Sequence, residues 1–215
     1  MHYTSVLFDL DGTLLDTLGD LTAAMNRTLT RHGLPERTRQ QMRAALGNGA
    51  RRLMELSVPA GTDGALFETL LAEYNADYAA HCRIETAPYP GIDALLRQLH
   101  AQGRKLAIVS NKPDEAVRAL RADFFADTIS IAVGEKQGIR RKPAPDTLLA
   151  AMAQLGAERS STVYVGDSEV DIATARAAGL PCISVLWGFR DRDLLEQAGA
   201  QQFATDADEL ARLLD

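Results

Sequence analysis

The feature that most constrains the fold of this chain is a series of short apolar segments rich in β-branched residues. They are three to five residues long, carry few charges, and lie at positions 6–10, 106–109, 129–133, 163–165 and 182–186. Short segments that are apolar on both faces are typical of strands in a parallel sheet covered by helices on each side.

Helical patterns separate the later segments. Apolar residues from Ile92 to Leu99 recur at helical spacing, and Pro113 and Pro145 are each followed by acidic residues, as at a helix start. Ser168 to Asp171 predicts a capping box for a helix that Gly179 ends. The alternation of strands and helices predicts an α/β fold with a parallel sheet.

The chain from position 17 to 85 breaks this alternation and contains no convincing strand. Apolar spacing predicts helices near 21–29, 37–46, 50–57 and 67–78. We therefore expect residues 17–85 to form an all-helical insert, and residues 1–16 and 86–215 to form the sheet domain.

Composition excludes several kinds of partner. The 215 residues carry a net charge of -6, which provides no overall field for nucleic acid or an acidic membrane surface. The two cysteines lie far apart without zinc-like spacing, which favours a reduced, cytoplasmic protein. The first residues lack the pattern of a signal peptide, and no apolar stretch approaches the roughly 20 residues of a membrane span. We expect neither a nucleic acid nor a membrane partner.

Two aspartates stand at the end of the first predicted strand. Side chains alternate along a strand, so Asp9 and Asp11 point the same way, about 7 Å apart. Gly12 then permits a tight turn with close backbone approach. The alternative is that both acids serve only the turn, but their shared face at a strand end favours a binding site.

A second acidic pair, Asp167 and Asp171, follows the segment at 163–165. Asp171 has an alternative role as the capping partner of Ser168. If the two strands are neighbours, these acids converge with Asp9 and Asp11. Two unit charges 4 Å apart repel by about 4 kcal/mol at an effective dielectric constant near 20. Because all donors are oxygens, the sequence predicts Mg²⁺ bound by Asp9, Asp11, Asp167 and Asp171.

Two other predicted strand ends supply groups of opposite polarity. Ser110 and Asn111 precede a helix start, where anions bind readily, although simple capping is an alternative. Lys142 precedes Pro143 and ends a run of three cations that could equally be a solvated loop.

Together these groups suit the hydrolysis of a phosphate monoester. Asp9 would attack phosphorus and form an aspartyl-phosphate, while Asp11 would act as acid and then base. Ser110, Lys142 and the cation would neutralise the oxygens of the transferred group. Gly12, Thr13 and Asn111 are further candidates for binding the substrate phosphate.

These residues resemble the four motifs of the haloacid dehalogenase superfamily. Asp9 to Thr13 resembles the first motif, Ser110 the second, Lys142 the third, and Gly166 to Asp171 the fourth. The resemblance implies a Rossmann-like core, a helical cap, a Mg²⁺ ion held partly by the backbone carbonyl of Asp11, and a small phosphorylated metabolite as substrate. We expect a monomer or a homodimer.

Within the superfamily the sequence most resembles the phosphoglycolate phosphatase subfamily. The likeness includes Asp16, the segment 20–24, and Gly47-Asn48-Gly49 in a predicted cap loop. The resemblance implies that Gly47, Asn48 and Gly49 contact the substrate; an ordinary turn between helices is the alternative.

Other functions stay open at this point. A pyrophosphatase, a sugar-phosphate phosphatase or a mutase would share the core. A non-catalytic phospho-accepting signalling domain uses similar groups, but it is about half this length and has no cap. Asp11 disfavours dehalogenase chemistry, and a dinucleotide-binding dehydrogenase is disfavoured because no G-x-G-x-x-G follows the first strand.

Overall fold

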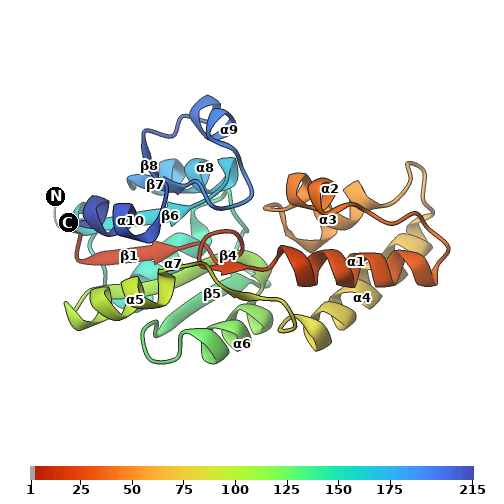
Figure 1. The fold of residues 1–215 in the computed structure, drawn as a ribbon, viewed down its shortest axis with the longest axis horizontal. Coiled ribbons are helices and arrows are strands. Elements are labelled where there is room, and N and C mark those ends of the chain that lie inside the picture. Colours follow the sequence, from red (N-terminus) through yellow and green to blue (C-terminus); the bar gives the residue numbers. More distant parts are fainter. Residues whose placement is uncertain (1–2) are drawn as a thin grey trace. The chain divides into compact units, whose positions relative to one another are not determined.

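The computed structural model describes residues 3–215 (Figure 1). Contacts between residues divide the chain into two units. The core unit comprises the chain up to Leu15 together with Pro88–Asp215, and the helical unit comprises Asp16–Ala87. The helical unit thus begins one residue before, and ends two residues after, the predicted insert at 17–85.

The core unit is built on a six-stranded sheet whose strands all run parallel (Figure 1). The order is β5-β4-β1-β6-β7-β8, with β1 in the interior between β4 and β6. The strands are β1 (Ser5–Phe8), β4 (Lys105–Pro113), β5 (Ile131–Glu135), β6 (Thr162–Gly166), β7 (Cys182–Val185) and β8 (Gln202–Ala204). The predicted parallel α/β core is therefore confirmed.

Helices cover both faces of this sheet. On one face, α7 and α8 pack on Leu7 of β1 and Tyr164 of β6, both fully buried. Val6 and Phe8 point to the opposite face and are also fully buried, so that face is covered as well. The helices are α5 (Ile92–Ala101), α6 (Asp114–Phe124), α7 (Asp146–Leu155), α8 (Glu169–Ala178), α9 (Arg192–Gln197) and α10 (Ala207–Leu214), with a short 3₁₀ turn at Arg159–Ser161.

The sequence pattern did not predict β8, α9 or α10. β8 has only three residues and begins with an exposed glutamine at the edge of the sheet, where one neighbour suffices. Its composition therefore lacks the apolar run that marks an interior strand. Two strands of two residues each, β2 (Leu15–Asp16) and β3 (Ala87–Pro88), carry the chain between the units and pair with each other.

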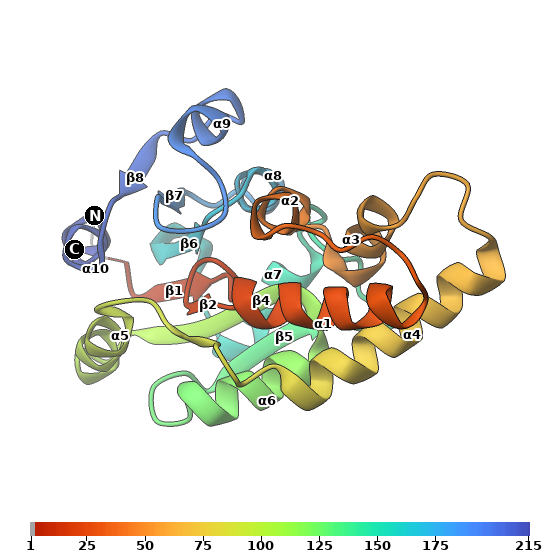
Figure 2. The ribbon, with the colours of Figure 1, turned by 45° about the vertical axis from the view of Figure 1, so that its right-hand side comes forward.

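The helical unit contains α1 (Leu18–Arg31), α2 (Arg39–Ala45), α3 (Gly49–Ser57) and α4 (Gly64–His81). α1 and α4 run side by side (Figure 2). Local chemistry sets the helix starts: Thr38 and Gln41 form a capping box on α2, and Asp63 accepts backbone N–H bonds at the start of α4. Within residues 3–215, no helix combines the length and apolar character needed to cross a membrane.

Candidate active site

The carboxyl ends of β1 and β6 bring three of the predicted acids together. Phe8 and Val165 are in register, and the Asp9 backbone N–H donates to the Val165 carbonyl oxygen at 2.9 Å. Asp167 follows β6, and Asp171 lies in the first turn of α8. Asp9, Asp167 and Asp171 are buried, and each offers a carboxylate oxygen within 4.8 Å of the others.

Lys142 lies among these acids. Its Nζ is 2.9 Å from Oδ1 of Asp9 and 2.7 Å from Oδ1 of Asp171, and only 2% of its side chain is exposed. It also contacts the Tyr164 hydroxyl at 3.0 Å. Tyr164, in the middle of β6, was missed by sequence reasoning because a tyrosine within an apolar strand resembles core.

The charges in this cluster do not balance. Burial, opposed by Lys142 and reinforced by the neighbouring acids, raises the pKa of Asp9 well above its usual value. Burial and the charge of Asp171 raise the pKa of Asp167 to about 7. Burial acts on Asp171 too, but attraction and hydrogen bonding from Lys142 outweigh it and lower its pKa. Lys142 thus lowers the pKa of only one of the three carboxylates. Asp9 and Asp167 tend to keep a proton in the absence of further positive charge, and a divalent cation would supply the charge that holds them as carboxylates.

Asp171 combines the two roles that the sequence left open. Its Oδ2 accepts hydrogen bonds from the Ser168 backbone N–H at 3.1 Å and the Ser168 hydroxyl at 2.6 Å, which caps α8. Its Oδ1 accepts from Lys142 at 2.7 Å and from Tyr164 at 2.9 Å. Because each of its oxygens already accepts two hydrogen bonds from the protein, Asp171 has less capacity for a cation than Asp9.

Asp9 divides its two oxygens between different tasks. Oδ1 accepts a hydrogen bond from the Leu10 backbone N–H at 2.7 Å and faces Lys142. Oδ2 accepts no hydrogen bond from the residues that the structure describes. One oxygen is therefore held in place, and the other keeps its lone pairs for a ligand.

Asp11 lies outside the group of three acids. Its carboxylate forms an ion pair with Nζ of Lys112, a lysine whose side chain is 5% exposed. The family resemblance assigns only the backbone carbonyl of Asp11 to the cation, and the acid/base role of its side chain stays a prediction. Lys112 is not among the candidate site residues predicted from the sequence, although it directly follows the candidates Ser110 and Asn111.

Ser110 and Asn111 are both buried, but they belong to a strand rather than to a loop before a helix. The predicted strand at 106–109 continues to Pro113, and α6 begins at Asp114. The Ser110 hydroxyl accepts from the Lys112 backbone N–H at 3.2 Å, and Asn111 Nδ2 donates to the Lys142 carbonyl oxygen at 3.0 Å. The bond from Asn111 to Lys142 connects the second and third motifs.

Gly12 and Thr13 contact Asp167 from the first motif. The Thr13 hydroxyl donates to Oδ1 of Asp167 at 3.0 Å. Gly12 has φ +85°, and a Cβ there would lie 2.4 Å from Oδ2 of Asp167. A side chain at position 12 is therefore excluded both by the backbone conformation and by the carboxylate.

Gly47, Asn48 and Gly49 lie between α2 and α3 in the helical unit. Gly47 and Gly49 both have positive φ values, of 107° and 76°. Their contact with a substrate stays a prediction. Arg51 and Arg52, which follow them, pair with Glu68 and Glu55 of the same unit.

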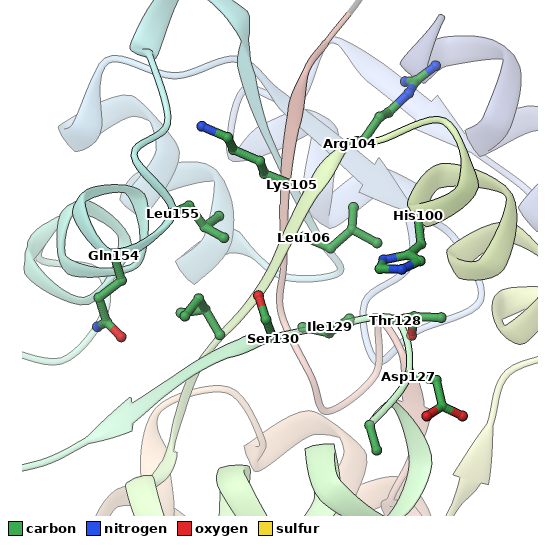
Figure 3. A pocket seen from close by; sticks show the side chains of 12 residues that line it. His100, Arg104, Lys105, Leu106, Asp127, Thr128, Ile129, Ser130, Gln154 and Leu155 are labelled. Atoms are coloured by element: carbon green, nitrogen blue, oxygen red, sulfur yellow. The ribbon is translucent and has the colours of Figure 1, made fainter.

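A cavity of about 390 Å³ lies elsewhere in the core unit (Figure 3). It is lined by the amino ends of β4 and β5, whereas the acids follow the carboxyl ends of β1 and β6. Figure 3 shows Arg104 turned away from Ser130, and its guanidinium donates to the Leu214 carbonyl oxygen. Lys105 bonds the Gly156 carbonyl oxygen. These cations are thus occupied, and the cavity lies outside the acidic site.

Comparison with known proteins shows which family the chain belongs to. A phosphoglycolate phosphatase from Xanthomonas campestris is 36% identical over 187 residues, which are 86% of this chain and 84% of the relative. An N-acetylmuramic acid 6-phosphate phosphatase from Pseudomonas aeruginosa is 32% identical over 217 residues, which are 100% of this chain and 96% of the relative.

A crystal structure from Lactobacillus delbrueckii subsp. bulgaricus, provisionally assigned as a phosphoglycolate phosphatase, matches with a TM-score of 0.94. It is 36% identical, and the match covers 100% of this chain and 99% of that one. The sequence profile of the haloacid dehalogenase-like hydrolases matches residues 6–185. The chain therefore belongs to the haloacid dehalogenase-like hydrolase family and is a phosphatase of that family.

Proposed function

We propose that this enzyme is a Mg²⁺-dependent phosphatase that transfers the phosphoryl group of a small monoester to Asp9 and then to water. The observation that carries the proposal is the buried group of Asp9, Asp167 and Asp171, in which Lys142 forms ion pairs with Asp9 and Asp171 and no ion pair of Asp167 is found among residues 3–215. Excess buried carboxylate is costly to the fold unless a cation binds there, so its presence points to function.

The donors fit Mg²⁺ by their chemistry. They are hard carboxylate oxygens, and neither a His nor a Cys belongs to the group found among the described residues. Asp9 and Asp167 are the ligands that we propose, with the Asp11 carbonyl as a third, while Asp171 orients Lys142 and α8. The ion supplies positive charge beside the phosphoryl oxygens when it is bound.

In the first step Asp9 acts as the nucleophile. Its Oδ1 is held by the Leu10 N–H and Lys142, so Oδ2 is the oxygen that attacks phosphorus. The bond from phosphorus to the leaving oxygen breaks as the bond to Asp9 forms. Asp11 gives the leaving oxygen a proton, and Ser110 and Lys142 stabilise the charge on the transferred group.

In the second step a water molecule attacks the aspartyl-phosphate. Asp11, now a carboxylate, takes the proton from that water, and Asp9 is released together with inorganic phosphate. Lys112 contacts Asp11 in this structure. We propose that this contact holds Asp11 in the direction from which it meets both the leaving group and the water.

We propose phosphoglycolate as the first substrate to test, because relatives from several bacteria with 34–38% identity carry that activity in their names. N-acetylmuramic acid 6-phosphate is the second candidate. The relative named for it aligns with the whole of this chain and 96% of its own length, so its cap region is included in the match.

A turnover assay with excess substrate tests the proposal. Phosphoglycolate, N-acetylmuramic acid 6-phosphate, glucose 6-phosphate and pyrophosphate are compared at equal Mg²⁺ by their kcat/KM values. We expect continuous phosphate release from at least one monoester. Release of a single equivalent per chain would instead identify a phospho-accepting switch, and preference for pyrophosphate would reject the monoester assignment.

A further inference from the structure

The loop after β7 contacts Asp167, although its residues belong to none of the four sequence motifs. The Phe189 backbone N–H donates to Oδ2 of Asp167 at 2.7 Å, while the Thr13 hydroxyl donates to Oδ1 at 3.0 Å. Each oxygen of this carboxylate therefore has one fixed donor, one from the β7 loop and one from the first motif. Two such bonds set the orientation of the carboxylate and leave lone pairs on both oxygens.

The same loop binds the first motif directly. The Trp187 indole Nε1 donates to the Thr13 carbonyl oxygen at 3.0 Å, although 174 positions separate the two residues. The ring of Tyr89 packs against Trp187, with 6.4 Å between the ring centroids. Trp187 thus holds the backbone of the residue whose hydroxyl bonds Asp167.

Gly188, between these two contacts, has no room for a side chain. A Cβ there would lie 2.3 Å from Cβ of Asp167 and 2.5 Å from the Gly12 carbonyl oxygen. Both distances are shorter than atoms can approach, because the backbone of the β7 loop lies directly against Asp167. Arg190 fixes the far end of the loop by an ion pair with Glu169 at 2.7 Å.

We propose that Trp187, Gly188 and Phe189 position the carboxylate of Asp167 for the cation, so that this loop determines Mg²⁺ affinity without contacting the ion. The inference rests on the proposed function, in which Asp167 binds Mg²⁺. Partners that orient a metal ligand typically change metal affinity by about 10- to 100-fold when they are removed.

The test titrates the 215-residue protein with MgCl₂ and follows the fluorescence of Trp187, the one tryptophan in the sequence. Gly188→Ala is compared with Gly64→Ala, which adds the same methyl group where a Cβ would meet nothing within 4 Å. We expect the Kd for Mg²⁺ to rise about 10- to 100-fold in Gly188→Ala and to stay within about twofold of wild type in Gly64→Ala. At saturating Mg²⁺, kcat recovers in Gly188→Ala.

A second variant, Trp187→Phe, removes the bond to Thr13 and keeps an aromatic ring; its Mg²⁺ affinity is measured by calorimetry. If circular dichroism shows that Gly188→Ala does not fold, the Mg²⁺ affinity of Trp187→Phe serves as the test instead. A wild-type Kd in a folded Gly188→Ala protein, or in Trp187→Phe when Gly188→Ala is unfolded, overturns the inference. If the wild-type protein itself binds no Mg²⁺, the proposed metal site is wrong instead.

Discussion

The two units bury carboxylates in opposite ways. In the helical unit, Asp77 on α4 has a side chain that is 3% exposed, and it pairs with Arg27 at 2.6 Å and Arg31 at 3.0 Å on α1. Burial would raise its pKa, but the two guanidinium groups and His81 lower it below the usual value. In the core unit, burial leaves the pKa values of Asp9 and Asp167 raised.

Asp20 follows the pattern of Asp77 with backbone donors in place of cations. It is buried in the first turn of α1 and accepts hydrogen bonds from the N–H groups of Ile84, Glu85 and Thr86, and from the Thr86 hydroxyl. These bonds tie the segment after α4 to α1.

The difference separates structural from functional carboxylates. Asp77 faces two arginines, and Asp20 accepts hydrogen bonds from three backbone N–H groups and a hydroxyl. Each of these carboxylates is therefore stabilised by the protein without any ligand. In the core unit, the single positive charge of Lys142 acts on three carboxylates, those of Asp9, Asp167 and Asp171. This one charge is too little to hold all three in the ionised form. The four predictions below test this distinction.

The largest effect is expected from Asp9→Asn. This change removes the nucleophilic oxygen and should lower kcat with p-nitrophenyl phosphate by more than about a thousandfold. It also removes charge from an overcrowded cluster, so circular dichroism should show an intact fold. Residual activity above a few per cent would contradict the nucleophilic role of Asp9.

Removal of the cation should come next. We expect excess chelator to stop turnover and added Mg²⁺ to restore it. Mg²⁺ at a hundred times its Kd should also stabilise the folded protein by about 3 kcal/mol, because it binds only the folded state. Asp167→Ala should lose most of this gain in thermal or urea unfolding. Full activity in chelator, or an unchanged Mg²⁺ response in Asp167→Ala, would argue against the assigned ligands.

A matched pair of substitutions compares the two units directly. Asp77→Asn should lower the free energy of unfolding by about 2 kcal/mol, because it removes the ion pairs with Arg27 and Arg31. The loss stays at this size because both arginines are partly exposed and water can solvate them afterwards. Asp167→Asn, measured without metal, should be neutral or stabilising because it relieves repulsion. Urea unfolding of both proteins gives the comparison, and equal destabilisation by the two changes would remove the distinction between the units.

The smallest effect is expected in the pH dependence of the stability that Asp77 contributes. The pKa of Asp77 is lowered from its usual 3.8 in the folded protein, so its contribution to stability is present above that value. The contribution is lost as pH falls through the folded pKa. The difference in unfolding free energy between wild type and Asp77→Asn should therefore shrink below about pH 4. A difference that grows with acidification would reverse the assigned direction.

Local pattern predicted much of this molecule. The alternation of short apolar segments with capped helices predicted the parallel core. The placement of acids at strand ends predicted that Asp9, Asp11, Asp167 and Asp171 would converge; the carboxylates of Asp9, Asp167 and Asp171 do, whereas that of Asp11 lies outside the group. Such inferences succeed because strand periodicity and helix caps depend on residues close together in the sequence.

Spacing could not reveal which groups would face one another across the sheet. Lys112 pairs with Asp11 from a neighbouring strand, and Tyr164 meets Asp171 through the core. β8 escaped prediction because an edge strand needs little apolar sequence.

By itself the sequence determined the chemistry available: which carboxylates, lysines and hydroxyls stand at strand ends. Only the tertiary structure decided how each is used. Strand order sets Trp187 against Thr13 and Phe189 against Asp167, and the number of donors around each buried carboxylate follows from that packing. The physical reason is that the free energy of a buried charge depends on every group around it, whatever their separation along the chain.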